Sequence, residues 1–182
     1  GAFKHGQFGI ISLGKDYAET FNFEKSYFRL DFMLHEDNGN NDVEDFSDWN
    51  GAYSLVTKWE NNDWYFWTDL SFADRKKGDV WGIQLMPFYD ITDKTQAIFC
   101  YTHLESSKNN QLRASRWEDR LPPRGSVGRG DELTEYFVGL NYFLFGHKLK
   151  WQNGLQYTEM DKTDGTTAYD GWGFTTAFRI SW

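Results

Sequence analysis

The chain of 182 residues has one cysteine, three prolines and no long apolar run. With Cys100 alone, no internal disulfide can form, and its strand-like surroundings favour a small apolar side chain over a reactive thiol. No stretch of about 18 apolar residues occurs, which excludes a membrane-spanning helix. Cations are outnumbered, with 19 Lys and Arg against 27 Asp and Glu, and the net charge of -8 argues against a nucleic-acid partner, because such partners select a basic face.

The sequence also lacks the patterns of a catalytic or metal site. Neither Gly-x-Ser-x-Gly nor His-x-x-Glu-His occurs, and no pair of His or Cys has ligand spacing. The four histidines lie near predicted strand ends or turns. We therefore expect no enzyme activity, no catalytic residues, no metal and no cofactor.

What the chain has in abundance is aromatic residues, which make up 19%. Over the last twelve positions, large apolar residues alternate with small or polar ones, as along a strand with two unlike faces. One face holds Trp172, Phe174, Thr176, Phe178, Ile180 and Trp182. A transmembrane barrel turns such a face toward lipid, and Trp and Tyr form girdles at its two interfaces. A soluble lipocalin-like barrel would instead bury its apolar face inside, and the aromatic bands favour lipid.

Similar alternation predicts eight earlier strands, of which the first is weak. They are expected at 7–13, 26–36, 51–59, 63–73, 80–89, 94–104, 134–144 and 148–160. The facing of 94–104 is left open, because Ile98 and Phe99 are both apolar. Nine is an odd number, whereas bacterial single-chain barrels have even numbers. The chain is therefore expected to be the C-terminal part of a larger barrel, with an eight-stranded barrel as the alternative.

The connections between these segments alternate in length. Three of four at one end are long, and three of four at the other are short turns. The first set is 37–50, 74–79, 105–132 and 161–170; the second is 60–62, 90–93, 145–147 and a longer link before Ser26. Short periplasmic turns and long external loops are typical of outer-membrane barrels. We therefore place the first set outside and Trp182 at the periplasmic end.

Three segments carry a resemblance to a known family. They are DVWGIQLMPFYDITDK at 79–94, VGLNYFLFGHKLK at 138–150 and YDGWG at 169–173. In this order they resemble the phosphate-selective porin O and P family, from about Phe21 to Trp182. The resemblance implies an all-β, antiparallel transmembrane barrel of sixteen strands, usually a trimer, integral to the bacterial outer membrane. Residues 1–182 would be one barrel domain supplying the last nine strands, and the missing half would include a pore-constricting loop.

If the apolar parity faces lipid, the opposite parity lines the pore. That set is Arg29, Asp31, Lys58, Asp69, Gln84, Lys148, Lys150, Gln152, Gln156 and Arg179. Five are cations and two are anions, and a cationic wall attracts anions and offers N–H donors that replace lost hydration. In the alternative interpretation the charges pair with each other, as Arg29 and Asp31 would on one strand face.

Two external loops carry opposite charge. Segment 37–50 holds Asp37 and a possible constriction set, Asp42, Glu44, Asp45 and Asp48. In the family the corresponding loop can fold into the pore, and an acidic one departs from phosphate selectivity. Segment 105–132 holds Lys108, Arg113, Arg116, Arg120, Arg124 and Arg129. These could contact lipopolysaccharide phosphates or draw anions to the mouth; the alternative is a solvated loop paired with Glu118 and Asp119.

The sequence thus predicts a porin for passive diffusion of small hydrophilic solutes, with anions such as phosphate among them. The alternative is a structural or adhesive outer-membrane barrel without a conducting pore. The expected partners are outer-membrane lipid and lipopolysaccharide, two further copies in a homotrimer, and the barrel-assembly machinery through the strand ending at Trp182.

Overall fold

The computed structural model describes residues 7–36, 49–109, 111–113, 129–146 and 148–181. Most of them lie in β-strands, and one short helix, α1 (Ala18–Phe21), joins the first two strands. Nine strands of 10 to 14 residues form one sheet. They are β1 (Gln7–Asp16), β2 (Lys25–Glu36), β3 (Trp49–Asn61), β4 (Trp64–Arg75), β5 (Val80–Thr92), β6 (Thr95–Ser106), β9 (Glu132–Phe145), β10 (Leu149–Asp161) and β11 (Thr167–Ile180).

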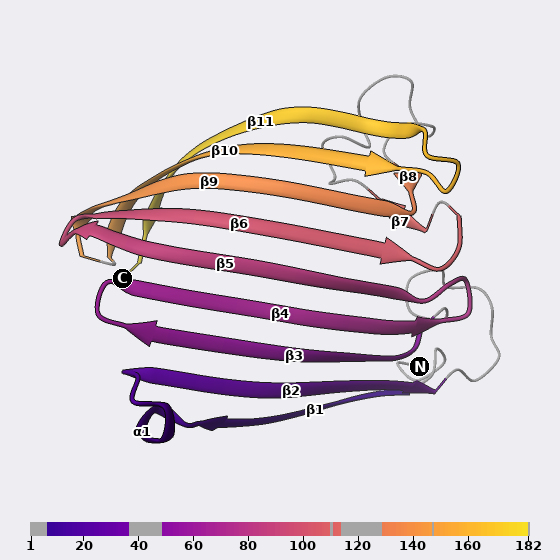
Figure 1. Ribbon diagram of the computed structural model, residues 1–182, viewed down its shortest axis with the longest axis horizontal. Helices are drawn as coiled ribbons and strands as arrows, with labels where there is room; N and C mark the ends of the chain where they lie inside the picture. The colour runs from indigo at the N-terminus through magenta and orange to yellow at the C-terminus, as the bar shows by residue number, and fades with distance from the viewer. Residues whose placement is uncertain (1–6, 37–48, 110, 114–128, 147, 182) are drawn as a thin grey trace, which may run out of the picture.

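The nine strands of the sheet are arranged in the order in which they occur in the chain, and each adjacent pair is antiparallel. Figure 1 shows the order as one colour series across the sheet, from indigo β1 to yellow β11. Two short strands, β7 (Leu112–Arg113) and β8 (Arg129–Gly130), pair separately within the connection from β6 to β9. In the described residues β1 and β11 are the sheet edges and do not pair with each other, so the sheet is open.

The predicted all-β antiparallel architecture is confirmed, and each expected segment overlaps one strand of the sheet. Most strand ends differ from the predicted ones by one to three residues or more, and two of these differences change the position of a predicted site residue or loop. Strand β10 begins at Leu149, so Lys148 lies in the preceding turn. The loop expected at 161–170 is shortened to 162–166, because β10 and β11 extend into it. Extra paired residues satisfy backbone N–H and C=O groups, which sequence alternation alone does not reveal.

The connections lie at the two ends of the sheet as their lengths predicted. One end, the turn end, has the short turns at 62–63 and 93–94, the turn residues Gly146 and Lys148, and α1. The turns at Asn62 and Gly146 use left-handed backbone, with φ of 52° and 50°. The other end, the loop end, has 76–79, the connection from β6 to β9, and 162–166. Segment 37–48, which includes the proposed acidic constriction set, lies outside the described residues.

The two faces of the sheet differ in chemistry. On one side of the sheet, the apolar face, the strand register places large apolar residues opposite each other, as it does Leu30, Leu55 and Leu70. These side chains are exposed: Leu70 is 49% and Phe174 is 69% accessible. Within the described ranges the buried apolar side chains are Ala73, Leu112 and Met160, so no second layer covers this face.

Register also settles how β6 faces. Phe99 lies opposite Val138 and Ile98 lies opposite Gly139. Val138 is an exposed apolar-face residue, and Ile98 lines a cavity with polar side chains on the other side. Phe99 therefore belongs to the apolar face and Ile98 to the polar face, an ambiguity that alternation could not resolve.

Candidate functional site

The second side of the sheet, the polar face, holds the charged and amide side chains. Its residues are linked through directly opposite pairs, for example Asp69–Gln84–Thr102–Glu135–Thr158. Opposite residues in antiparallel strands share a face. By this register the polar face carries the predicted residues Arg29, Asp31, Lys58, Asp69, Gln84, Lys150, Gln152, Gln156 and Arg179. Lys148 does not lie on the polar face; it is exposed in the turn before β10.

Several predicted wall charges are satisfied locally. Arg29 Nε donates to Asp31 Oδ2 at 2.9 Å, and Ser54 donates to the same oxygen at 3.2 Å. The Lys58 ammonium lies 4.3 Å from the centroid of the Trp67 ring, a cation–π contact. Arg29 and Asp31 thus pair with each other, as the interpretation in which wall charges pair predicted. This pairing reduces the electrostatic field of the polar face around β2 and β3.

Acidic groups on this face are likewise held by neutral donors. Gln156 Nε2 donates to Glu135 Oε2 at 2.6 Å, and Thr158 donates to it at 3.2 Å. Ser71 donates to Asp69. Neutral donors stabilise a carboxylate without cancelling its charge. The carboxylates of Asp69 on β4 and Glu135 on β9 are therefore held in place by hydrogen bonds on the polar face.

Lys150 and Arg179 differ from the other cations. They lie directly opposite each other on β10 and β11. Among the described residues neither forms an ion pair, and Lys150 lies over the Phe143 ring at 6.0 Å. Like charges on opposite residues repel. This pair therefore concentrates positive charge near the turn end.

The cation pair borders a cavity of about 520 Å³ on the polar face, the turn-end cavity. Residues of β3, β4, β5, β6, β9, β10 and β11 line it, which requires the sheet to curve around it. The lining is Glu60, Tyr65, Trp67, Phe88, Asp90, Thr92, Asp93, Gln96, Ile98, Asn141, Phe143, Gly146, Lys150, Gln152 and Arg179. The polar face is thus the hollow side of the sheet.

A row of hydrogen bonds crosses this cavity from β5 to β10. Gln152 donates to Asn141 at 2.9 Å, Asn141 to Gln96 at 2.9 Å, and Gln96 to Asp90 at 2.8 Å. Tyr65 also donates to Asp90, at 3.0 Å. The four residues from Asp90 to Gln152 are opposite one another in register. Alternation along β10 predicted Gln152 on this face but could not identify the other members of the row, because pairing across strands decides which amides meet.

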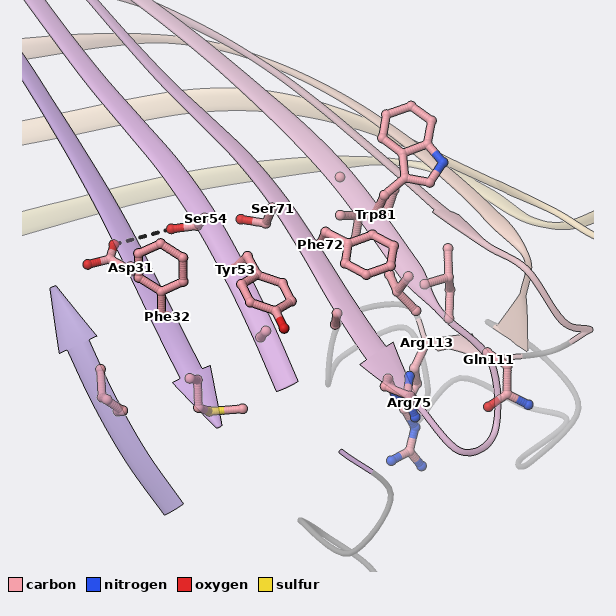
Figure 2. A pocket seen from close by; sticks show the side chains of 18 residues that line it. Asp31, Phe32, Tyr53, Ser54, Ser71, Phe72, Arg75, Trp81, Gln111 and Arg113 are labelled. Carbon is pink, nitrogen blue, oxygen red and sulfur yellow. Dashed lines mark hydrogen bonds between the residues drawn. The ribbon is translucent and has the colours of Figure 1, made fainter. Parts of the chain in front are cut away.

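A second cavity, of about 350 Å³, lies at the loop end, the loop-end cavity. Residues of β2, β3, β4 and β5 contribute to its wall, with Ala52 and Gly82 among them. Figure 2 shows Asp31 and Ser54 joined by their hydrogen bond, with Arg75, Gln111 and Arg113 gathered toward the loop end. Residues 111–113 belong to the connection from β6 to β9, so part of that connection contributes to the cavity wall.

The β7–β8 pair is anchored against the sheet. Leu112 is buried with Met160 of β10, and Asp131 accepts hydrogen bonds from the backbone and hydroxyl of Thr163. A Cβ at Gly130 would come within 2.3 Å of the Asp161 carbonyl oxygen. The sequence predicted a solvated or anion-attracting loop over 105–132. Its described parts pack on the polar face, while Arg116, Arg120 and Arg124 lie outside the described residues.

No helix in the described part of the chain is long and apolar enough to cross a membrane. Comparisons with family models, curated proteins and solved structures found no match to this chain.

Proposed function

We propose that the chain forms part of the wall of an outer-membrane porin, a β-barrel that lets small hydrophilic solutes diffuse through a polar lumen. In this proposal the apolar face contacts lipid and the polar face lines the pore. The observation that carries it is the pattern of the apolar face, on which two aromatic rows border an aliphatic band.

The first aromatic row crosses the apolar face toward the loop end. It runs through opposite or touching residues, with ring centroids 5.9 Å apart for Phe32 and Tyr53 and 4.9 Å apart for Tyr157 and Trp172. Its members are Phe32, Tyr53, Phe72, Trp81, Tyr101, Tyr136, Tyr157 and Trp172. The His103 ring contacts both Trp81 and Tyr101 and so connects the two parts of this row.

The second row lies toward the turn end. Its pairs include Trp64 and Tyr89, with centroids 4.5 Å apart, and Trp151 and Phe178 at 6.0 Å. Its members are Phe28, Trp59, Phe66, Trp64, Tyr89, Tyr142, Trp151 and Phe178. Between the rows lie mainly aliphatic residues, Leu30, Leu55, Leu70, Ile83, Phe99, Val138, Leu155 and Phe174.

The two rows are separated along the strands, as the two girdles of an outer-membrane barrel are. Tyr53 and Trp59 are six positions apart on β3, which corresponds to about 20 Å at about 3.3 Å per residue. Outer-membrane barrels carry an apolar band about 25 Å tall between two aromatic girdles. Tyr and Trp favour the interface because each ring is apolar and carries a polar O–H or N–H group. Two aromatic rows with a mainly aliphatic band between them therefore fit a face in contact with lipid better than a face packed against a protein layer.

The charge distribution opposes the soluble alternative. If the apolar face lay in water, the exposed patch would exceed the few hundred Å² that soluble monomers tolerate. If the polar face were a core, Lys150 and Arg179 would be buried side by side, which costs several kcal/mol per ion. Lipid on one side and water on the other satisfies both faces at once.

The open edges fit the same proposal. Unpaired N–H and C=O groups of β1 and β11 could not face hydrocarbon, since each costs several kcal/mol there. In the membrane each edge therefore pairs with a strand outside these nine, closing a barrel. The resemblance to the phosphate-selective porin O and P family supports sixteen strands and a trimer with lipopolysaccharide around it.

The proposal is tested on the purified protein, expressed together with the strands that complete its barrel. Three measurements are made: extraction with detergent, gel migration with and without heating, and current recording in a lipid bilayer. We expect solubility only in detergent, faster gel migration before boiling, and stepwise ion conductance. A folded, detergent-dependent barrel without conductance would favour the structural or adhesive alternative. A soluble, monodisperse protein without detergent would contradict the membrane proposal.

A further inference from the structure

We propose that the turn-end cavity selects short zwitterionic peptides, binding the carboxylate at Lys150 and Arg179 and the ammonium group at Asp90. The inference rests on the proposed porin function and names a solute class for it. It depends on opposite charges being separated across one cavity by a row of neutral amides.

The positive side of the cavity is formed by β10 and β11. Lys150 and Arg179 both line the cavity and lie opposite each other. Neither forms an ion pair among the described residues, so both are available to a solute carboxylate. Two cations in one place bind a carboxylate by charge-assisted hydrogen bonds.

The negative side is formed by β5 and its turn. Asp90 accepts hydrogen bonds from Tyr65 at 3.0 Å and from Gln96 at 2.8 Å, which fix its position without neutralising it. Asp93 also lines the cavity, from the β5–β6 turn. A carboxylate held in this way can accept further hydrogen bonds from an ammonium group, because each oxygen has two lone pairs.

The other charged groups around the cavity leave this separation intact. Glu60 pairs with Lys25, with 3.5 Å between Nζ and Oε1, so these two charges offset each other. The ammonium of Lys58 lies over the Trp67 ring, on the far side of Asp90 from the cation pair. The neutral amides of Gln96 and Asn141 occupy the row in between.

The distance between the two sides fits a peptide of about three residues. Asp90 on β5 and Lys150 on β10 are separated by three strand-to-strand steps, about 14 Å along the sheet at about 4.8 Å each. The Lys150 ammonium reaches over Phe143 of β9, the strand toward Asp90. The gap is thereby reduced to about 10 Å, the span of three extended residues at about 3.3–3.6 Å each.

A solute with only one charge would be attracted by one side and repelled by the other. A zwitterion of the right length gains at both sides, and the amide row offers donors and acceptors to its peptide groups. Each screened charge contact contributes up to about 1 kcal/mol, and 1.4 kcal/mol is tenfold. We therefore expect entry about two- to fivefold faster for the zwitterion.

The test is osmotic swelling of liposomes that contain the reconstituted full barrel. The probes are four derivatives of equal length: triglycine, N-acetyl-triglycine, triglycine amide and N-acetyl-triglycine amide. They are zwitterionic, anionic, cationic and neutral. We expect triglycine to enter fastest. Asp90→Asn should remove its advantage over the anionic derivative, and Lys150→Gln with Arg179→Gln should remove its advantage over the cationic one.

Asp69→Asn is the matched control, because it removes a carboxylate from the same face outside this cavity and should preserve the order of rates. Heat-modifiable migration of every variant verifies folding. An unchanged order of rates in both Asp90→Asn and the double variant would overturn the inference, as would fastest entry of N-acetyl-triglycine into wild-type liposomes. Swelling with the neutral derivative but without zwitterion preference overturns only this inference. No swelling with any derivative overturns the porin proposal itself.

Discussion

Glycine positions on the polar face show how single residues set the shape of the sheet. Gly139 and Gly154 are directly opposite each other on β9 and β10, and the Phe137 ring lies over both. A Cβ would come within 2.8 Å of this ring at Gly139 and within 2.2 Å at Gly154. Real Cβ atoms do not approach that closely, so the aromatic ring needs glycine beneath it.

Gly154→Ala should therefore displace Phe137 and destabilise the protein by about 1–3 kcal/mol, the usual cost of overpacking. Gly173→Ala is the control, because its Cβ would lie 3.9 Å from the nearest heavy atom, Cβ of Gln156. The measurement is the free energy of unfolding in urea, in lipid vesicles. Equal stability of the two variants would contradict a packing role for Phe137.

Ion selectivity is a second prediction for individual residues. Replacing Lys150 and Arg179 together by Gln should shift the reversal potential in a salt gradient toward cations, because the pair lacks carboxylate partners among the described residues. Arg29→Gln removes one cation instead of two and should shift it less. Lys148→Gln tests whether a cation in the turn before β10 also contributes to the reversal potential. An unchanged potential in the double variant would show that the pair lies outside the constriction.

Among the elements, the β7–β8 pair changes the shape of the loop end. Leu112 holds it against Met160, which is fully buried. Leu112→Asp should release the pair, because a buried unpaired carboxylate costs several kcal/mol, and single-channel conductance should rise as the loop end widens. Leu112→Met keeps the apolar contact and should conduct as wild type. If both variants conduct alike, the pair does not narrow the pore.

The faces of β11 provide a matched comparison within one strand. Phe174 is on the apolar face and Thr175 on the polar face, opposite Leu155 and Gly154. Phe174→Arg should destabilise the protein by about 2–4 kcal/mol if Phe174 faces the bilayer midplane, whereas Thr175→Arg should cost much less in a water-filled lumen. Reversible unfolding in lipid measures both. Similar costs at the two positions would remove the assignment of the faces.

For the whole molecule, orientation follows from the grouping of connections at the two ends of the sheet. Epitope tags inserted in 162–166 should bind antibody on intact cells, because this connection lies at the loop end, the end that we propose to be external. Tags at Asn62 and Asp63, in a short turn at the opposite end, should bind only after the outer membrane is permeabilised. Labelling in the reverse pattern would invert the proposed orientation.

Much of the architecture could be predicted from residues near one another in the chain. Alternation with a period of two locates a strand and assigns its faces, as the 171–182 segment shows, because successive side chains point to opposite sides. Strand ends were less accurate, and Lys148 fell outside β10. The facing of Ile98 and Phe99 required the partner strand, since two adjacent apolar residues satisfy either register.

The sequence by itself determined the position of the strands, the facing of every strand with clear alternation, and the contrast between long and short connections, since all three are local properties. Tertiary structure alone decided which side chains meet across strands. Register placed Gln96 and Asn141 between Asp90 and Gln152, paired Arg29 with Asp31, and left Lys150 beside Arg179. Curvature then joined seven strands around one cavity. These contacts depend on pairing and bending of the sheet, which no single segment encodes.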